Sequence, residues 1–191
     1  MTTTESAPSG CIFAIVGPSG CGKSALIGEM LQRFPSTLAI MPSLTTRSRR
    51  LVDEDCSTRF VTRDEFRELE RSGSLIQWVE YDGNLYGDAC ADIEAIFASG
   101  RHGIRPLIEA AVRSFRAKGY RVVMVKVVPT GKGFENRSKA RQVIDAERER
   151  EALAPDIEIV NRFEDGGFAA ACAQLQAFIR AKITDSGGPY L

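Results

Sequence analysis

The sequence predicts a three-layer α/β domain with a mainly parallel central sheet, and three observations support this prediction. CIFAIV (residues 11–16) is a short, wholly apolar run rich in strand-forming residues, followed by glycines and a helical pattern. YRVVMVKVV (residues 120–128) is the strongest strand signal in the chain. Runs without polar alternation are typical of strands buried on both faces of a parallel sheet. Strand and helix signals also alternate along the rest of the chain, as this architecture requires.

Spacing and end signals place the other elements. Apolar residues at helical spacing predict a helix over residues 23–33, which Pro35 ends. TRDE (62–65) is a capping box and predicts a short helix to about Ser72. The same reasoning predicts strands at 75–81 and 156–161, and helices at 91–100, 108–119 and 168–183.

The composition narrows the class of protein. The 191 residues suit one domain, and 25 basic against 25 acidic side chains give no net field for a nucleic acid or an anionic membrane surface. The five cysteines form no CxxC pair, and the single histidine, His102, removes the usual zinc partners. No secretory signal and no apolar run of ~18 residues is evident. We therefore expect a cytoplasmic protein without nucleic-acid or membrane partners.

The segment GPSGCGKS (17–24) satisfies the pattern G-x-x-x-x-G-K-[ST] between a predicted strand and a predicted helix. Glycines allow backbone amides to surround phosphate oxygens, Lys23 supplies a positive charge, and Ser24 is a potential magnesium ligand. Cys21 lies beside Lys23 and a helix start, which could activate its thiol, although a small residue tolerated in the loop is the simpler interpretation. The predicted nucleotide-binding residues here are Gly17, Pro18, Ser19, Gly20, Cys21, Gly22, Lys23, Ser24 and Ala25.

The order of motifs resembles that of the guanylate kinase family. After the phosphate loop come TTRSRR (45–50), FVTRDEF (60–66), IQWVEYDGNLYG (76–87) and VNRFED (160–165). The resemblance implies a P-loop NTPase-type fold and transfer of the γ-phosphate of ATP to a nucleoside monophosphate, with Mg²⁺. It divides the chain into tails at 1–10 and 184–191 and one domain at 11–183, with a core at 11–34 and 99–183, an acceptor-binding (NMP-binding) segment at about 38–90 and a lid at about 129–142.

The resemblance also implies roles for single residues on the acceptor side. Arg47 and Arg50 fall on arginines that clamp the acceptor phosphate, which suits the planar guanidinium fork. Arg49 stands where the family usually has proline and is interpreted as a solvated bystander. Tyr86 falls on a tyrosine that touches the same phosphate. Ser43, Gln77 and Asp88 complete the expected acceptor-binding set.

On the donor side, Arg137 and Arg141 match lid arginines and are expected to act in catalysis with Lys23. Asn161 matches an asparagine near the adenine and ribose of ATP. An asparagine that caps a turn at a strand end would look the same in the sequence.

Two departures from the family pattern bear on the acceptor and the metal. Gln77 and Asp88 replace a glutamate and a small hydroxyl residue that read guanine, and an amide offers one acceptor and one donor where a carboxylate offers acceptors only. GMP or dGMP is therefore only one of several possible acceptors. Thr58 also replaces a tyrosine that contacts the acceptor phosphate.

The second departure lies in SGRHGIRPLIEAA (99–111), where Pro106 and Ile108 occupy positions that are acidic in the family. Glu109 is the nearest carboxylate and is predicted to support the metal together with Ser24. A strand that contains Pro106 is expected to be distorted or to lie at an edge. His102 and Arg105 could face the acceptor pocket, but a surface turn is the simpler interpretation of His102.

Three alternatives to a nucleoside monophosphate kinase remain at this point. One is a kinase for another small phosphorylated acceptor, such as a ribose phosphate, although Trp78 and Tyr86 favour a nucleotide. Another is a guanylate-kinase-like module that binds phosphopeptides, against which the complete phosphate loop argues. A nucleic-acid-binding protein is disfavoured by the lack of net charge. The expected partner is a small-molecule nucleotide, and the expected state is a monomer or homodimer.

Overall fold

A computed structural model describes residues 10–49, 58–131, 134 and 153–184. Within these residues a five-stranded parallel sheet forms the centre of the domain. The sheet order is β2 (Leu38–Ile40), β7 (His102–Pro106), β1 (Ile12–Val16), β8 (Val122–Thr130) and β9 (Ile157–Arg162). Every residue of β1 is buried, as its apolar run predicts for a central strand.

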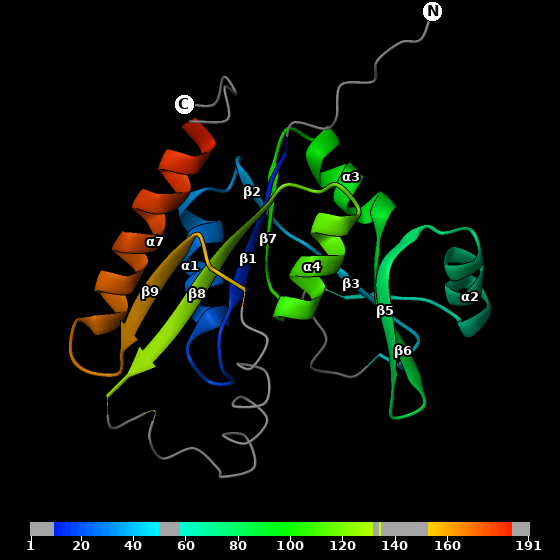
Figure 1. The fold of residues 1–191 in the computed structure, drawn as a ribbon, viewed down its shortest axis with the longest axis horizontal. Coiled ribbons are helices and arrows are strands. Elements are labelled where there is room, and N and C mark those ends of the chain that lie inside the picture. The colour runs from blue at the N-terminus through cyan, green and yellow to red at the C-terminus, as the bar shows by residue number, and fades with distance from the viewer. Residues whose placement is uncertain (1–9, 50–57, 132–133, 135–152, 185–191) are drawn as a thin grey trace, which may run out of the picture.

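Helices cover both faces of this sheet, and Figure 1 shows the three layers. Phe13 and Ile15 of β1 pack on one face with helices α1 (Lys23–Arg33) and α7 (Gly167–Thr184). Ile12 and Ala14 point to the other face, toward α3 (Cys90–Ala98) and α4 (Glu109–Ala117). Alternate residues of one strand therefore belong to two cores, and the predicted fold class is confirmed.

A second, smaller sheet follows the first helix. Its order is β4 (Thr58–Phe60), β3 (Ser43–Thr45), β6 (Asn84–Ala89) and β5 (Leu75–Tyr81). Strand β6 is antiparallel to both β3 and β5, and β3 is parallel to β4. Helix α2 (Arg63–Arg71) buries Phe66 against it. The predicted capping box is present: the Thr62 hydroxyl accepts from the Glu65 amide at 3.2 Å, and Glu65 Oε2 accepts from the Thr62 amide at 2.7 Å.

Strand β7 corrects two expectations from the sequence. The strand lies between β2 and β1, in the interior of the sheet, although it contains Pro106. Pro106 is the last residue of the strand, paired with Ile15, so its missing N–H affects only the end of the ladder. His102 is not in a surface turn: it begins the strand, is 6% exposed, and its Nδ1 accepts a hydrogen bond from the Cys11 amide at 3.1 Å.

The described part of the chain contains no helix long and apolar enough to cross a membrane.

The burial of His102 makes the stability of the fold depend on pH. Burial lowers the pKa of His102 below its ordinary value, and the positive charge of Arg121 lowers it further. Between the lowered pKa and about 6.5 the unfolded chain binds more protons than the folded one. The contribution of His102 to the free energy of unfolding should therefore be complete above about pH 6.5 and should be lost progressively as the pH decreases below that value.

His102→Asn provides the matched control, because the asparagine Oδ1 can take the place of Nδ1 as acceptor and does not titrate. Urea unfolding from about pH 7 to about pH 5 should show a steeper loss of stability in the parent protein than in the variant. Equal slopes would contradict the assignment of the pH dependence to His102.

Candidate functional site

The loop between β1 and α1 approaches its neighbours so closely that two of its residues must be glycine. Gly17 has φ +147°, and a Cβ there would lie 2.6 Å from the Val127 carbonyl oxygen of β8. Gly22 has φ +95°, and a Cβ there would lie 2.5 Å from Asn161 Nδ2 of β9. Side chains would push the loop off the sheet, so the glycines are needed to keep it at the C-terminal ends of these strands.

Lys23 begins α1 and folds back over this loop. Its Nζ donates hydrogen bonds to the carbonyl oxygens of Gly17 at 2.9 Å and Pro18 at 2.8 Å. Ser24, the next residue, is exposed at the start of the helix. A helix start, a nearby ammonium group and an exposed hydroxyl are the features that hold a polyphosphate and its metal ion.

Asn161 has a structural place in this site that its sequence context did not reveal. Its side chain is 3% exposed, and Nδ2 donates a hydrogen bond to the Cys21 carbonyl oxygen at 2.9 Å. The amide therefore ties β9 to the phosphate loop. Cys21 itself is buried, and this burial raises the pKa of its thiol despite the nearby charge of Lys23. An activated thiolate at this position, considered from the sequence, is thus disfavoured.

A pocket of about 490 Å³ joins this loop to the smaller sheet. Gly17, Ser19 and Lys23 line it at one end. The predicted acceptor-binding residues that line it are Ser43, Gln77, Tyr86 and Asp88. Residues from the end of β7 and the start of α4 also line the pocket, namely Arg105, Pro106, Leu107, Ile108 and Ala111, and the smaller sheet adds Trp78, Val79 and Gly87. Residues predicted for the donor and for the acceptor therefore open onto one cavity.

The polar centre of this pocket is a buried carboxylate. Gln77 and Asp88 are cross-strand partners in β5 and β6, next to a bulge in β5. Gln77 Nε2 donates to Asp88 Oδ2 at 2.8 Å, and Arg105 Nη1 forms an ion pair with Asp88 Oδ1. Asp88 is 1% exposed, and Arg105 also donates to the Pro42 carbonyl oxygen at 3.1 Å. The sequence suggested that Arg105 could face this pocket, but nothing in its motif linked it to Asp88.

Several predicted site residues lie elsewhere. Arg47 does not line the pocket: its Nη1 donates to the Ser48 carbonyl oxygen at 2.9 Å, and its Cζ lies 5.3 Å from the centre of the Phe60 ring. Arg49 Cζ lies 5.2 Å from the same ring, so the residue interpreted as a solvated bystander shares this contact. Arg50, Arg137 and Arg141 lie outside the described residues.

The structure does not bring Glu109 to the pocket. The residue begins α4, its Oε2 accepts a hydrogen bond from the Leu153 amide at 2.6 Å, and it is absent from the pocket wall. Among the residues that the structure describes, no cluster of three or more His, Cys, Asp or Glu side chains could hold a metal ion. Ser24 and Glu109 both stay predictions as metal ligands, and of the two only Ser24 belongs to the phosphate loop.

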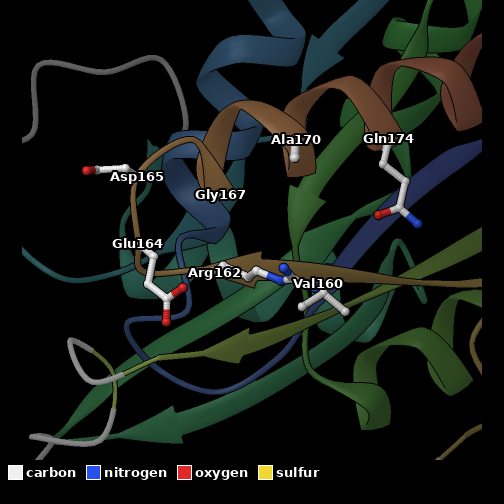
Figure 2. Close-up of a pocket in the computed structure, with 7 residues that line it drawn as sticks. All are labelled: Val160, Arg162, Glu164, Asp165, Gly167, Ala170 and Gln174. Carbon is white, nitrogen blue, oxygen red and sulfur yellow. The ribbon is translucent and has the colours of Figure 1, made fainter.

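A second hollow, of about 400 Å³, lies on the outer side of the sheet, where β9 meets α7. Figure 2 shows Val160 and Arg162 along β9, with Ala170 and Gln174 on the helix above them. It contains none of the residues of the phosphate loop. This hollow is thus distinct from the pocket that joins the two sheets.

The guanylate kinase family model matches residues 11–182. The chain belongs to the guanylate kinase family. The guanylate kinase of Bordetella pertussis is 35% identical over 138 residues, which cover 71% of this chain and 64% of that protein. The guanylate kinase of Symbiobacterium thermophilum is 29% identical over 188 residues, 92% of this chain and 87% of that one.

The matched part of the chain thus spans 64% of the length of the Bordetella relative, which is slightly less than two thirds. A solved structure supports the guanylate kinase fold. The crystal structure of guanylate kinase from Anaplasma phagocytophilum matches with a TM-score of 0.64 at 24% identity, covering 91% of this chain and 86% of that one.

The role of Asn161 in holding the guanylate kinase phosphate loop can be tested by Asn161→Asp. The change keeps the shape but replaces a donor with an acceptor that faces the Cys21 carbonyl oxygen. We expect a loss of about 2 kcal/mol in the free energy of unfolding, because a buried bond to a backbone group is lost and two oxygens face each other.

Gln174→Glu is the matched control for this test, because it makes the same chemical change at an exposed amide that donates to the Glu158 carbonyl oxygen at 3.4 Å. Urea unfolding of both variants measures the difference. A loss at Gln174 as large as that at Asn161 would show that burial of the loop contact is not the cause.

Proposed function

We propose that this chain transfers the γ-phosphate of ATP to a nucleoside monophosphate of the GMP class, giving ADP and a nucleoside diphosphate. The observation that carries this proposal is one pocket that is lined both by Gly17, Ser19 and Lys23 and by Ser43, Tyr86 and Gln77. Such a pocket allows a donor and an acceptor to be held next to each other. Membership of the guanylate kinase family supports the same reaction.

The proposed reaction requires aligned substrates and positive charge around the transferred phosphate, and it requires no nucleophile from the protein. Phosphoryl transfer proceeds through a loose transition state with charge spread over the transferred oxygens. In the proposed reaction the amides of the glycine loop hold the donor phosphates, and Lys23 leaves the carbonyl oxygens of Gly17 and Pro18 to face them. Tyr86 and Ser43 hold the acceptor end of the pocket.

The residues present fit a magnesium ion that is held mainly by nucleotide phosphates. Mg²⁺ commonly takes one or two oxygen ligands from the protein, and the exposed hydroxyl of Ser24 at the start of α1 is suited to this role. A Mg²⁺ ion held there would neutralise charge on the nucleotide phosphates. We propose Ser24 as its protein ligand and leave Glu109 out of the site.

The arginines remain part of the proposal. Arg47 and Arg50 are proposed to hold the acceptor phosphate, and Arg137 and Arg141 to contact the transferred phosphate with Lys23. For Arg47 this requires a change of side-chain rotamer away from Phe60 and the Ser48 carbonyl oxygen. A guanidinium group that stacks on a half-buried aromatic ring, as Phe60 is, exchanges a modest interaction for a stronger charge-assisted one when it moves to a phosphate.

The function is tested by ADP release from Mg-ATP with a panel of acceptors: GMP, dGMP, AMP, CMP, UMP and ribose phosphates. We expect turnover with GMP-class acceptors. Turnover with ribose phosphates alone would replace the nucleotide by another phosphorylated acceptor, and no turnover together with no ATP binding would overturn the kinase proposal.

Lys23→Met should lower kcat by about a hundredfold or more, because it removes positive charge from the transferred phosphate while keeping an unbranched side chain. Lys118→Met is the control, since Lys118 is exposed and its Nζ donates to the Gly73 carbonyl oxygen at 3.3 Å, away from the pocket wall. Steady-state kinetics and thermal unfolding are measured on both variants. Unchanged kcat for Lys23→Met would remove the phosphate loop from the mechanism.

Arg47→Ala and Arg49→Ala form a matched pair, because both side chains contact the ring of Phe60. Only Arg47→Ala should raise the acceptor KM, by about tenfold for one lost charge-assisted hydrogen bond, with the KM for ATP largely kept. Initial rates at varied acceptor and varied ATP separate the two constants. Equal effects of both changes would indicate a packing role at Phe60 instead of an acceptor contact.

A further inference from the structure

The buried carboxylate of Asp88 fixes the direction in which Gln77 faces the pocket. Asp88 is 1% exposed and is bound on both of its oxygens, Oδ2 by Gln77 Nε2 at 2.8 Å and Oδ1 by Arg105 Nη1. A carboxylate paired with a guanidinium group only accepts hydrogen bonds. The amide of Gln77 must therefore direct its NH2 group at Asp88, so its Oε1 is directed away from Asp88. An amide without such a neighbour could adopt either orientation.

The same contacts compensate the negative charge of Asp88 in the pocket wall. Asp88 carries the carboxylate, but Arg105 neutralises it and is itself anchored to the Pro42 carbonyl oxygen at 3.1 Å. Gln77 then offers one acceptor, Oε1, and its second N–H as a donor. Asp88 is the one carboxylate among the described residues of the pocket wall, and both of its oxygens already accept hydrogen bonds from the protein.

An amide held in this way is complementary to one kind of base edge. A ring N–H beside a carbonyl oxygen, as at N1 and O6 of a 6-oxopurine, can give one hydrogen bond to Oε1 and accept one from Nε2. Adenine presents its acceptor on the ring and its donor outside it, so it requires the amide in the opposite orientation. The 2-amino group of guanine makes no pair with this amide when N1 and O6 are bound.

Resting on the proposed kinase function, we propose that Gln77, held by Asp88 and Arg105, selects 6-oxopurine monophosphates through N1 and O6 and does not read position 2 of the ring. IMP is therefore an acceptor of nearly the same quality as GMP, and AMP is a poor one. Asp88 and Arg105 act as positioning residues for Gln77. An acceptor-only side chain in place of Gln77 would instead bind the 2-amino group and so favour GMP over IMP.

The first test compares kcat/KM for GMP, IMP and AMP at saturating Mg-ATP. The values for GMP and IMP should agree within about threefold, and AMP should be lower by about tenfold or more, the effect of one or two mismatched buried groups. GMP better than IMP by more than tenfold, or AMP as good as IMP, would overturn the proposal. No turnover with any of the three would overturn the kinase function and this proposal with it, whereas the first two outcomes leave the kinase function in place.

Two variants separate positioning from a purely structural ion pair between the sheets. Asp88→Asn removes the acceptor-only neighbour, so the side-chain amide of Gln77 can adopt the reversed orientation. The preference for IMP over AMP should then fall by about tenfold. The double change Gln77→Glu with Asp88→Ser keeps one carboxylate near Arg105 and creates an acceptor-only wall. It should raise the GMP to IMP ratio by about tenfold, because a carboxylate pairs with both N1–H and the 2-amino group.

Asp156→Asn is the control for these variants. Asp156 pairs with Arg116 at 3.5 Å and is outside the pocket wall, so its loss should change thermal stability without changing any acceptor ratio. If Asp88→Asn also lowered stability and left the IMP to AMP ratio unchanged, Asp88 and Arg105 would be structural only, and the proposal would be wrong.

Discussion

The close contact between the phosphate loop and the ends of β8 and β9 is the constraint on which the site depends. Gly17 lies against the Val127 carbonyl oxygen, and Gly22 lies against the amide of Asn161. The loop can take this course only because neither residue carries a Cβ. The position of the loop in turn fixes where the first turn of α1 and the side chain of Lys23 lie relative to the sheet. All other parts of the site are arranged around that place.

The two sheets divide the remaining work. The parallel sheet supplies a rigid edge of strand ends, which is the usual ligand site of such sheets. The smaller sheet brings Gln77 and Asp88 to face that edge. Arg105 connects the two, because it leaves β7 of the parallel sheet and reaches both Asp88 of β6 and the backbone of Pro42. The same side chain thus links the two sheets and contributes to the chemistry of the pocket wall.

The sequence predicted the features that depend on local pattern and missed those that depend on distant partners. The buried strand, the glycine loop and the capping box at Thr62 could be recognised because each is a short motif with its own chemistry. Strands β2, β3 and β4 have three residues each, which is too short for any periodicity to show. His102 looked like a turn residue because nothing in the sequence shows that its Nδ1 meets the amide of Cys11. Asn161 and Arg105 were recognised as residues near the site, but their partners, Cys21 and Asp88, are far from them in sequence or belong to another sheet.

The contacts of Lys23 have a consequence for the protein before any nucleotide arrives. Its ammonium group donates hydrogen bonds to two carbonyl oxygens of the loop. These two carbonyl oxygens therefore have a hydrogen-bond donor within the loop itself. In the proposed reaction, phosphate oxygens would take the place of these carbonyl oxygens as its acceptors. When a nucleotide binds, the ammonium group exchanges two neutral acceptors for a polyanion. This exchange is favourable, because hydrogen bonds between charged groups are stronger than those to neutral carbonyl oxygens.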